Sequence, residues 1–170
     1  MRESLSWRPM RDEDRIDPAT FAIKAKVWKG VLKPGDLPRV ADLVASPEGE
    51  LRYEVSARLD NKRRKLVSCI IKGFAQLTCR VSMEDFRYDI DVEDRLVLVD
   101  DESHLPPIEM ESEEEDFVVA DGPLDVRGLV EDAVILALPM IPRKPGIEEP
   151  SAPADKPQRE SPFAALKRPK

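Results

Sequence analysis

From residue 51 to residue 99 the sequence repeats one pattern, in which apolar and polar residues alternate and short connections separate successive runs. In the first run every second residue is apolar: Leu51, Tyr53, Val55, Ala57 and Leu59. This alternation is typical of a strand with one buried and one wet face. Further strands are predicted at 66–72, 75–82 and 86–92, and residues 95–99 extend the last strand or begin a fifth. The short connections indicate antiparallel neighbours, and residues 24–32 suit an earlier strand.

Two segments outside this region have the spacing of helices. Asp36 can cap the first, Pro38 fits its first turn, and four apolar residues recur on one face: Leu37, Val40, Ala41 and Val44. Asp125 can cap the second helix, which is predicted to run to about Leu138 and to end at Pro139. The sequence therefore predicts an α+β fold, in which a mostly antiparallel sheet is packed by two main helices.

Composition divides the 170 residues into three parts. Residues 1–20 are polar and are expected to form a loose N-terminal arm. Residues 21–142 are expected to form a single α+β domain with an acidic loop at 100–121. Residues 143–170 hold 6 prolines and few large apolar residues, which predicts a disordered tail.

The net charge of −7 hides a strong asymmetry along the chain. Residues 1–75 hold 16 basic and 11 acidic residues, whereas residues 76–142 hold 4 basic and 19 acidic residues. Nine of these carboxylates lie between Asp100 and Asp116, a stretch without Lys or Arg. A protein that wraps nucleic acid by charge alone is usually basic overall, so the composition excludes that model and allows only a local basic patch.

The candidate RNA-contacting residues are basic and lie in the first half of the chain: Arg39, Arg58, Lys62, Arg63, Arg64 and Lys65. The last four form a turn between two predicted strands. Adjacent cations of this kind can bind the phosphate backbone without reading sequence. The alternative is a hairpin tip that only keeps the protein soluble.

The candidate contacts with a protein partner are acidic, with one aromatic residue in the tail: Glu113, Glu114, Glu115, Glu131, Asp132 and Phe163. The three consecutive glutamates belong to the acidic loop, which is either a solvated loop or a surface for a basic partner such as a ribosomal protein. Glu131 and Asp132 lie in an otherwise apolar helix, where a buried charge requires pairing. They occupy either its one wet stripe or a position that pairs in the core or with a partner. Phe163 lies in a short amphipathic stretch that could dock elsewhere.

The sequence offers no pattern of catalytic residues. The single histidine, His104, lies in the acidic loop, and the common phosphate-binding, dinucleotide-binding, serine-hydrolase and metalloprotease motifs do not occur. Cys69 and Cys79 lack a CxxC neighbour and are expected to be buried small residues. We expect no enzyme activity, cofactor, metal or small-molecule substrate, and no membrane span or secretory signal. The two cysteines form no disulfide framework, so a reducing, cytoplasmic compartment is expected.

The segment Leu129-Val-Glu-Asp-Ala-Val-Ile-Leu-Ala-Leu-Pro-Met-Ile-Pro142 resembles the late helix of the bacterial YceD family, the large-subunit ribosomal RNA accumulation proteins. Residues 30–43 are similar to the family's first strand and helix, and Ser161-Pro-Phe-Ala-Ala-Leu-Lys167 is similar to its N-P-F-A-x-L ending. The resemblance covers residues from about 20 to the C-terminus. It implies a cytoplasmic, non-enzymatic factor that supports processing or accumulation of 23S ribosomal RNA and assembly of the large subunit.

The chain departs from the family pattern at residues that could ligate a metal. Cys79 stands at the first cysteine of a C-x-R-C segment, but Val81 replaces the arginine and Ser82 replaces the second cysteine. Lys144 and Ile147 stand where many members have H-x-x-C. If relatives bind zinc through these positions, this chain is not expected to do so, because one thiol cannot hold the ion.

Two mechanisms remain open for such a factor. In the first, the acidic region 84–132 holds a basic large-subunit ribosomal protein before assembly, without direct RNA contact. In the second, the basic N-terminal half contacts 23S ribosomal RNA. The net charge of −15 over residues 76–142 favours a protein partner, because it repels phosphate. A metal-dependent nuclease fits least, since its acids would need a rigid strand-based site and these acids crowd a loop.

Overall fold

A computed structural model describes residues 14–107 and 115–147 of the chain. Its main sheet has the strand order β2 (Lys26–Leu32), β3 (Glu50–Leu59), β4 (Lys65–Thr78), β5 (Asp85–Val99) and β6 (Asp116–Val119). Strands β2 to β5 are antiparallel neighbours, whereas β6 runs parallel to β5. The predicted class is confirmed: within the described residues the fold is α+β, with a mostly antiparallel sheet and two α-helices.

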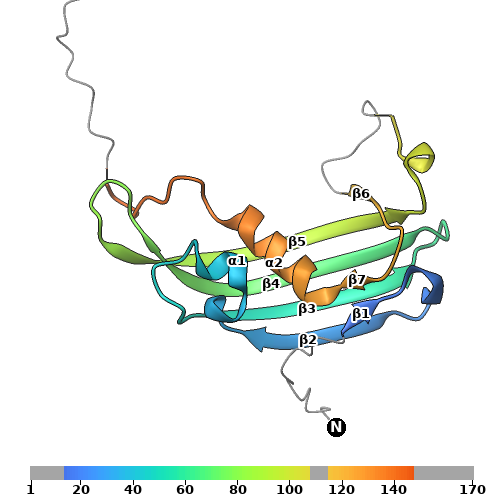
Figure 1. Cartoon of the computed structure of the whole chain (residues 1–170), viewed down its shortest axis with the longest axis horizontal. Coiled ribbons are helices and arrows are strands. Elements are labelled where there is room, and N and C mark those ends of the chain that lie inside the picture. The colour runs from blue at the N-terminus through green and yellow to red at the C-terminus, as the bar shows by residue number, and fades with distance from the viewer. Residues whose placement is uncertain (1–13, 108–114, 148–170) are drawn as a thin grey trace, which may run out of the picture.

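The two helices, α1 (Pro38–Ala41) and α2 (Val126–Ala137), lie over the same face of the sheet (Figure 1). α2 begins as predicted, because Asp125 Oδ2 accepts a hydrogen bond from the Gly128 backbone N at 3.0 Å. Buried residues of α2 share one core with buried strand residues, among them Val130, Val134, Val55 and Ile71. The apolar face of α2 is thus covered by the sheet.

α1 is a single helical turn, so the longer helix predicted from the spacing of residues 37–44 is wrong in length. Asp36 does not cap it. This residue ends a 3₁₀ helix at Pro34–Asp36, and its Oδ2 accepts a hydrogen bond from the Lys33 backbone N at 2.8 Å. Leu37 is the N-cap of α1 instead, and its apolar side chain cannot accept the N–H groups of the helix start.

The strands predicted at 66–72 and 75–82 are a single strand, β4, which continues through Gly73. The prediction of two strands was wrong because a glycine interrupts the alternation there. In the register of the sheet, Gly73 pairs with Leu51 on one side and with Ile90 on the other. β5 is also continuous, so residues 95–99 extend the preceding strand rather than begin a new one.

The predicted acidic loop at 100–121 contains regular structure in its described part. Residues 116–119 form β6 and pair with residues 96–99 of β5, while Glu102–His104 form a 3₁₀ helix. The loop prediction is therefore wrong for residues 116–119. His104 is exposed, as expected, and its Nδ1 lies 3.1 Å from Asp101 Oδ2.

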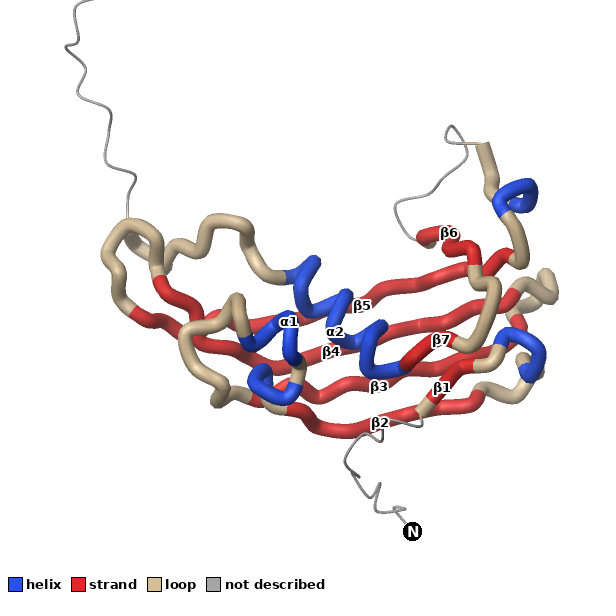
Figure 2. The backbone as a smooth tube through the Cα atoms, in the orientation of Figure 1, coloured by secondary structure: helices blue, strands red, loops and turns tan. Residues whose placement is uncertain are grey.

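The described chain is packed on the fold beyond both predicted domain boundaries. Within the predicted arm at 1–20, β1 (Arg15–Ile16) pairs with β7 (Leu124–Asp125), as Figure 2 shows, and Ile16 is only 1% exposed. After α2, Ile147 packs against a buried cluster that contains Cys79. Residues 1–13 and 148–170 lie outside the described residues, as do 108–114. Across the described ranges, no helix has the length and apolar character needed to cross a bilayer.

Candidate contact surfaces and the junction around Cys79

The predicted basic cluster lies at the tight turn between β3 and β4. Asp60 shapes this turn, because its Oδ1 accepts hydrogen bonds from the backbone N of Lys62 and of Arg64, both at 2.8 Å. Arg63 adopts a left-handed backbone conformation with φ 61°. The side chains of Lys62 and Arg63 are exposed and make no ion pair with any described residue. Two of the four predicted cations are therefore presented to solvent.

Arg64 and Lys65 are instead paired with acids near the two ends of the acidic stretch between Asp100 and Asp116. The Arg64 guanidinium donates two hydrogen bonds to the Glu115 carboxylate, at 2.9 and 3.1 Å, and a third to Asp60 Oδ2 at 2.7 Å. Lys65 Nζ donates to Asp100 Oδ1. The structure thus brings predicted RNA-contacting and partner-contacting residues together, and each neutralises the other.

Arg39 and the acidic pair of α2 are joined in the same way. Glu131 Oε1 accepts a hydrogen bond from the Arg39 backbone N at 2.6 Å, and its Oε2 accepts one from Arg39 Nε at 2.9 Å. Arg39 Nη2 lies 2.7 Å from Asp132 Oδ1. Glu131 is 7% exposed and pairs with Arg39 of its own chain, so it does not lie on the wet stripe of α2. Asp132 is exposed on the wet side of α2.

Burial raises the pKa of Glu131, but hydrogen bonds from the backbone and guanidinium of Arg39 outweigh it and hold that pKa below its ordinary value. The backbone N–H of Val40 adds to this effect. The carboxylate therefore supplies the acceptor that Leu37 cannot, and it caps the start of α1 from another helix.

The face of the sheet opposite α2 carries alternating charges that pair across and along the strands. Basic and acidic residues occur there in nearly equal number, and five pairs lie within 3.4 Å: Lys29–Glu54, Arg52–Glu50, Lys72–Asp91, Arg87–Asp89 and Arg95–Glu93. Arg58 is exposed on this face without an ion pair to a described residue. The face has little net charge to attract either nucleic acid or a basic protein.

A different group of acids, which the sequence reasoning missed, lies beside α2. Asp94 occupies a position of β5 that faces the core, where it pairs in register with buried Cys69. Burial, and to a lesser degree the charge of Asp94, raises the pKa of the Cys69 thiol to about 12. Asp94 and Asp116 line a hollow of about 290 Å³ together with residues of β5 and α2: Asp91, Val92, Glu93, Ala133, Leu136 and Ala137. We call this the acidic hollow. Burial, and then Asp116, raise the pKa of Asp94.

The sequence does contain a clue to the acidic hollow. Ile90, Val92, Leu96 and Leu98 are apolar at every second position of β5, and Asp94 is the single polar residue in that series. A carboxylate on the core-facing side of a strand requires a partner or a route to water. Among the described residues, neither Asp94 nor Asp116 has a cationic partner. Glu113, Glu114 and Phe163 lie outside the described residues.

The four positions of the possible metal-ligand pattern, at which this chain keeps only Cys79, lie together in space. Cys79 Sγ accepts a hydrogen bond from the Ser82 backbone N at 3.5 Å. The backbone N–H of Lys144, followed by Ser82 and Val81, lowers the pKa of the Cys79 thiol to about 6. Ile147 packs against the buried cluster around Cys79, which joins the turn after β4 to the chain after α2. We call this junction the clip.

The clip is closed by other interactions that need no metal. Arg80 backbone N donates to Pro142 O at 2.9 Å, and Lys144 Nζ donates to Glu84 Oε2 at 2.9 Å. The donor set does not fit zinc, which requires several thiolate, imidazole or carboxylate ligands. Within residues 14–107 and 115–147, no three histidine, cysteine, aspartate or glutamate residues are grouped to hold a metal ion.

We therefore expect the purified protein to contain less than about a tenth of an equivalent of zinc per chain, because one thiolate alone binds the ion weakly. Elemental analysis after dialysis against a metal-free buffer measures this ratio. Heat stability should be unchanged by a chelator. Stoichiometric zinc would show that ligands outside the described residues complete a site at the clip.

The fold defines a class of protein: a small α+β scaffold in which many charged side chains pair with one another across the surface. Comparison with protein families then identifies the particular family. The family model described as large ribosomal RNA subunit accumulation protein YceD matches residues 67–168, and the chain belongs to this family. No solved structure matches the chain significantly.

Proposed function

We propose that this protein supports the accumulation of large-subunit ribosomal RNA as a non-enzymatic assembly factor that holds a basic ribosomal protein of the large subunit. The family description supports the link to large-subunit ribosomal RNA. The acidic hollow is the observation that carries the choice of a protein partner. It combines two carboxylates, Asp94 and Asp116, that have no cation among the described residues with an apolar rim.

The acidic hollow suits a lysine or arginine flanked by apolar residues. Leu136 on its rim is 82% exposed, although large apolar side chains are usually covered where the fold permits. Asp94 is partly desolvated, as its raised pKa indicates, so a cation that enters the hollow meets a carboxylate with little competing water. A partner that covers Leu136 and pairs with Asp94 would gain both apolar burial and a charge-assisted hydrogen bond.

Direct contact with ribosomal RNA is the second candidate, and the exposed cations of the β3–β4 turn favour it. Arg58, Lys62 and Arg63 have no ion pair with a described residue. Arg64 and Lys65, however, are already neutralised by Glu115 and Asp100. Three scattered cations beside an acidic segment form a weak phosphate site, so we place the protein partner first.

The proposal is tested by isolating the tagged full-length protein from cells, with and without nuclease treatment. We expect a basic large-subunit ribosomal protein to remain bound after the RNA is removed. Recovery of ribosomal RNA alone, or loss of every ribosomal protein on nuclease treatment, would contradict the proposal and favour the RNA mechanism.

Removing the two charges of the acidic hollow should weaken binding of the ribosomal protein recovered in that experiment. We expect the double variant Asp94→Asn and Asp116→Asn to raise Kd about tenfold, because charge pairs in partly desolvated sites carry more energy than exposed ones. The matched control, Asp85→Asn and Asp89→Asn, removes the same net charge from exposed positions of β5 and should change Kd less than about twofold. Titration calorimetry measures both. Equal weakening by the two variants would mean that binding follows overall charge and not this hollow.

A further inference from the structure

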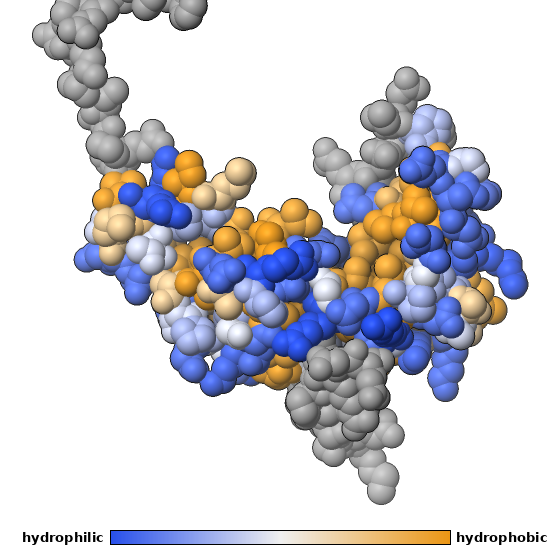
Figure 3. Space-filling view, in the orientation of Figure 1, coloured by the Kyte–Doolittle hydropathy of each residue, from blue (hydrophilic) through white to orange (hydrophobic). Residues whose placement is uncertain are grey.

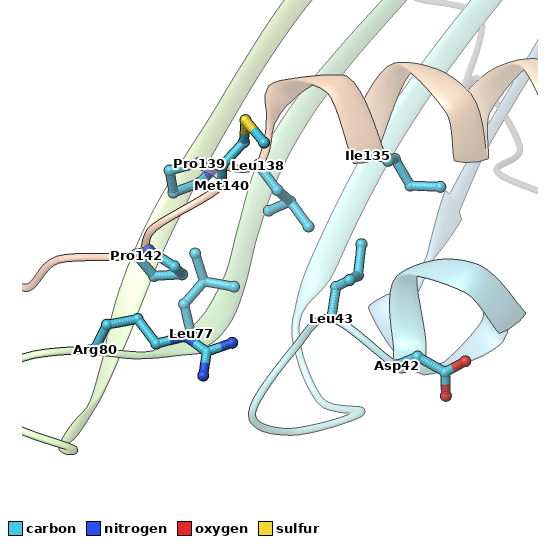
Figure 4. Close-up of a pocket in the computed structure, with 9 residues that line it drawn as sticks. All are labelled: Asp42, Leu43, Leu77, Arg80, Ile135, Leu138, Pro139, Met140 and Pro142. Carbon is cyan, nitrogen blue, oxygen red and sulfur yellow. The ribbon is translucent and has the colours of Figure 1, made fainter. Parts of the chain in front are cut away.

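A second hollow, open to solvent and mostly apolar, lies at the end of α2 next to the clip. Its volume is about 330 Å³, and its walls are formed by the loop after α1, the start of the turn after β4 and the chain from Ile135 to Pro142. Figure 4 shows Leu43, Leu138 and Met140 around this space, with Asp42 and Arg80 at its borders. We call it the terminal groove.

Large apolar side chains at the terminal groove are exposed to water. Met140 is 99% exposed, Leu43 is 52% exposed, and Ile141, which follows Met140, is also exposed. Figure 3 shows hydrophobic residues at the surface in the region of α2 and the chain that follows it. An apolar patch of this kind around a hollow marks a binding surface.

The course of the chain brings one particular segment to this groove. Leu77 lines the groove and belongs to the buried cluster against which both Leu138, another residue of the groove, and Ile147, the last described residue, pack. The chain therefore leaves the described fold beside the groove. After Ile147 the only large apolar residues are Phe163 and Leu166, which are three positions apart and would share one side of a helical turn.

We infer that the segment Ser161–Leu166 binds in the terminal groove of its own chain, with Phe163 and Leu166 as the buried side chains. Phe163 follows Ile147 by 16 residues, and a chain of that length can span up to about 55 Å, so the adjacent groove is within reach. The family match runs from residue 67 to residue 168 and thus includes this segment and the groove residues from Leu77 onward, but not Asp42 and Leu43. Tethering gives the segment a local concentration that a free peptide lacks.

Charged residues at the borders of the groove and at both ends of the segment favour one orientation of the bound segment. The segment is preceded by Glu160 and followed by Lys167. Arg80, whose backbone N donates a hydrogen bond to Pro142 O, lies at one border of the groove. Asp42, at the end of α1, lies at another border. Asp42 has no ion pair with a described residue. When the segment is bound, we therefore expect Glu160 to face Arg80 and Lys167 to face Asp42.

The inference is tested by photocrosslinking in the full-length protein, with p-benzoylphenylalanine in place of Phe163. We expect crosslinks within one chain to Leu43 or to residues 138–142, mapped by mass spectrometry. Crosslinks between chains would show that a second copy occupies the groove, and crosslinks to other surfaces would show that the segment binds elsewhere. Either outcome overturns the inference.

Two matched variants separate groove binding from general stickiness. Leu43→Asp should reduce the crosslink at least fivefold, whereas Leu136→Asp, on the same side of the fold but outside the terminal groove, should leave it within about twofold. Both side chains are exposed, so we expect both variants to fold, which circular dichroism checks. Equal loss in both variants would overturn the inference. The orientation is checked by Arg80→Glu, which should reduce the crosslink, and by the added change Glu160→Arg, which should restore it.

Discussion

Replacing Glu131 with alanine should lower the free energy of unfolding by about 3 kcal/mol, a large loss for a single polar residue. The carboxylate accepts hydrogen bonds from the backbone and guanidinium of Arg39, and the backbone N–H of Val40 also contributes to its low pKa. Its removal leaves the start of α1 without an acceptor, because Leu37 has none to offer. The arginine can return to water, so most of the loss comes from the helix N–H groups that remain partly buried.

Denaturant unfolding measures this loss, and Asp132→Ala is the matched control. Asp132 pairs with the same arginine at 2.7 Å, but it is exposed, and we expect its removal to cost less than about 1 kcal/mol. Similar losses in the two variants would show that Glu131 contributes only an ion pair and does not cap α1.

The pH dependence of stability follows from the direction of the Glu131 pKa. Because the folded-state pKa lies below the ordinary value of 4.5, the stabilisation by this carboxylate is present above pH 4.5 and is lost as the pH falls through the lower folded value. The wild-type protein should therefore lose more stability between pH 5 and pH 3 than the Glu131→Gln variant, which has no charge to lose.

Replacing Gly73 with alanine should destabilise the protein by about 3 kcal/mol or prevent folding, because β3 and β4 approach too closely for a side chain. A Cβ atom at residue 73 would lie 1.8 Å from the Glu50 carbonyl O and 3.0 Å from Leu51 Cα, and both are backbone atoms that cannot swing away. Relief would require the start of β3 to move off β4.

Gly122→Ala is the control for this change, since a Cβ atom there meets no atom within 4 Å. We expect Gly122→Ala to change the free energy of unfolding by less than about 1 kcal/mol in either direction. Soluble expression and denaturant unfolding compare the two variants. A Gly73→Ala protein as stable as the control would mean that the strands are farther apart than the structure places them.

Gly73 also explains which parts of the fold can be predicted from the sequence. Alternation identifies strands wherever one face is buried, and helical spacing with a capping aspartate identifies a helix, so β2, β3 and α2 were predicted close to their observed bounds. A glycine inside a strand has the same local appearance as a turn, and only the approach of another strand distinguishes the two. β6 was missed for a related reason, because its four residues are held by a parallel partner and not by their own pattern.

The contact surfaces were predictable in composition but not in arrangement. The sequence indicated a buried or partner-facing acid at Glu131 and a cation at Arg39, yet 92 positions separate them and no local pattern joins them. Arg64 and Glu115 were likewise assigned to different partners, whereas folding brings them into contact. Long-range pairing of this kind depends on topology, which the alternation of residues does not specify.

The pairs Lys65–Asp100 and Arg64–Glu115 hold both ends of the intervening stretch at one corner of the sheet. Because both ends are held in place, the stretch is a closed loop, and the entropic cost of closing a flexible loop grows only with the logarithm of its length. Doubling the stretch costs about 0.6 kcal/mol. We therefore expect insertions between residues 105 and 114 to be nearly neutral for the sheet, and relatives to differ in length here while the scaffold stays the same.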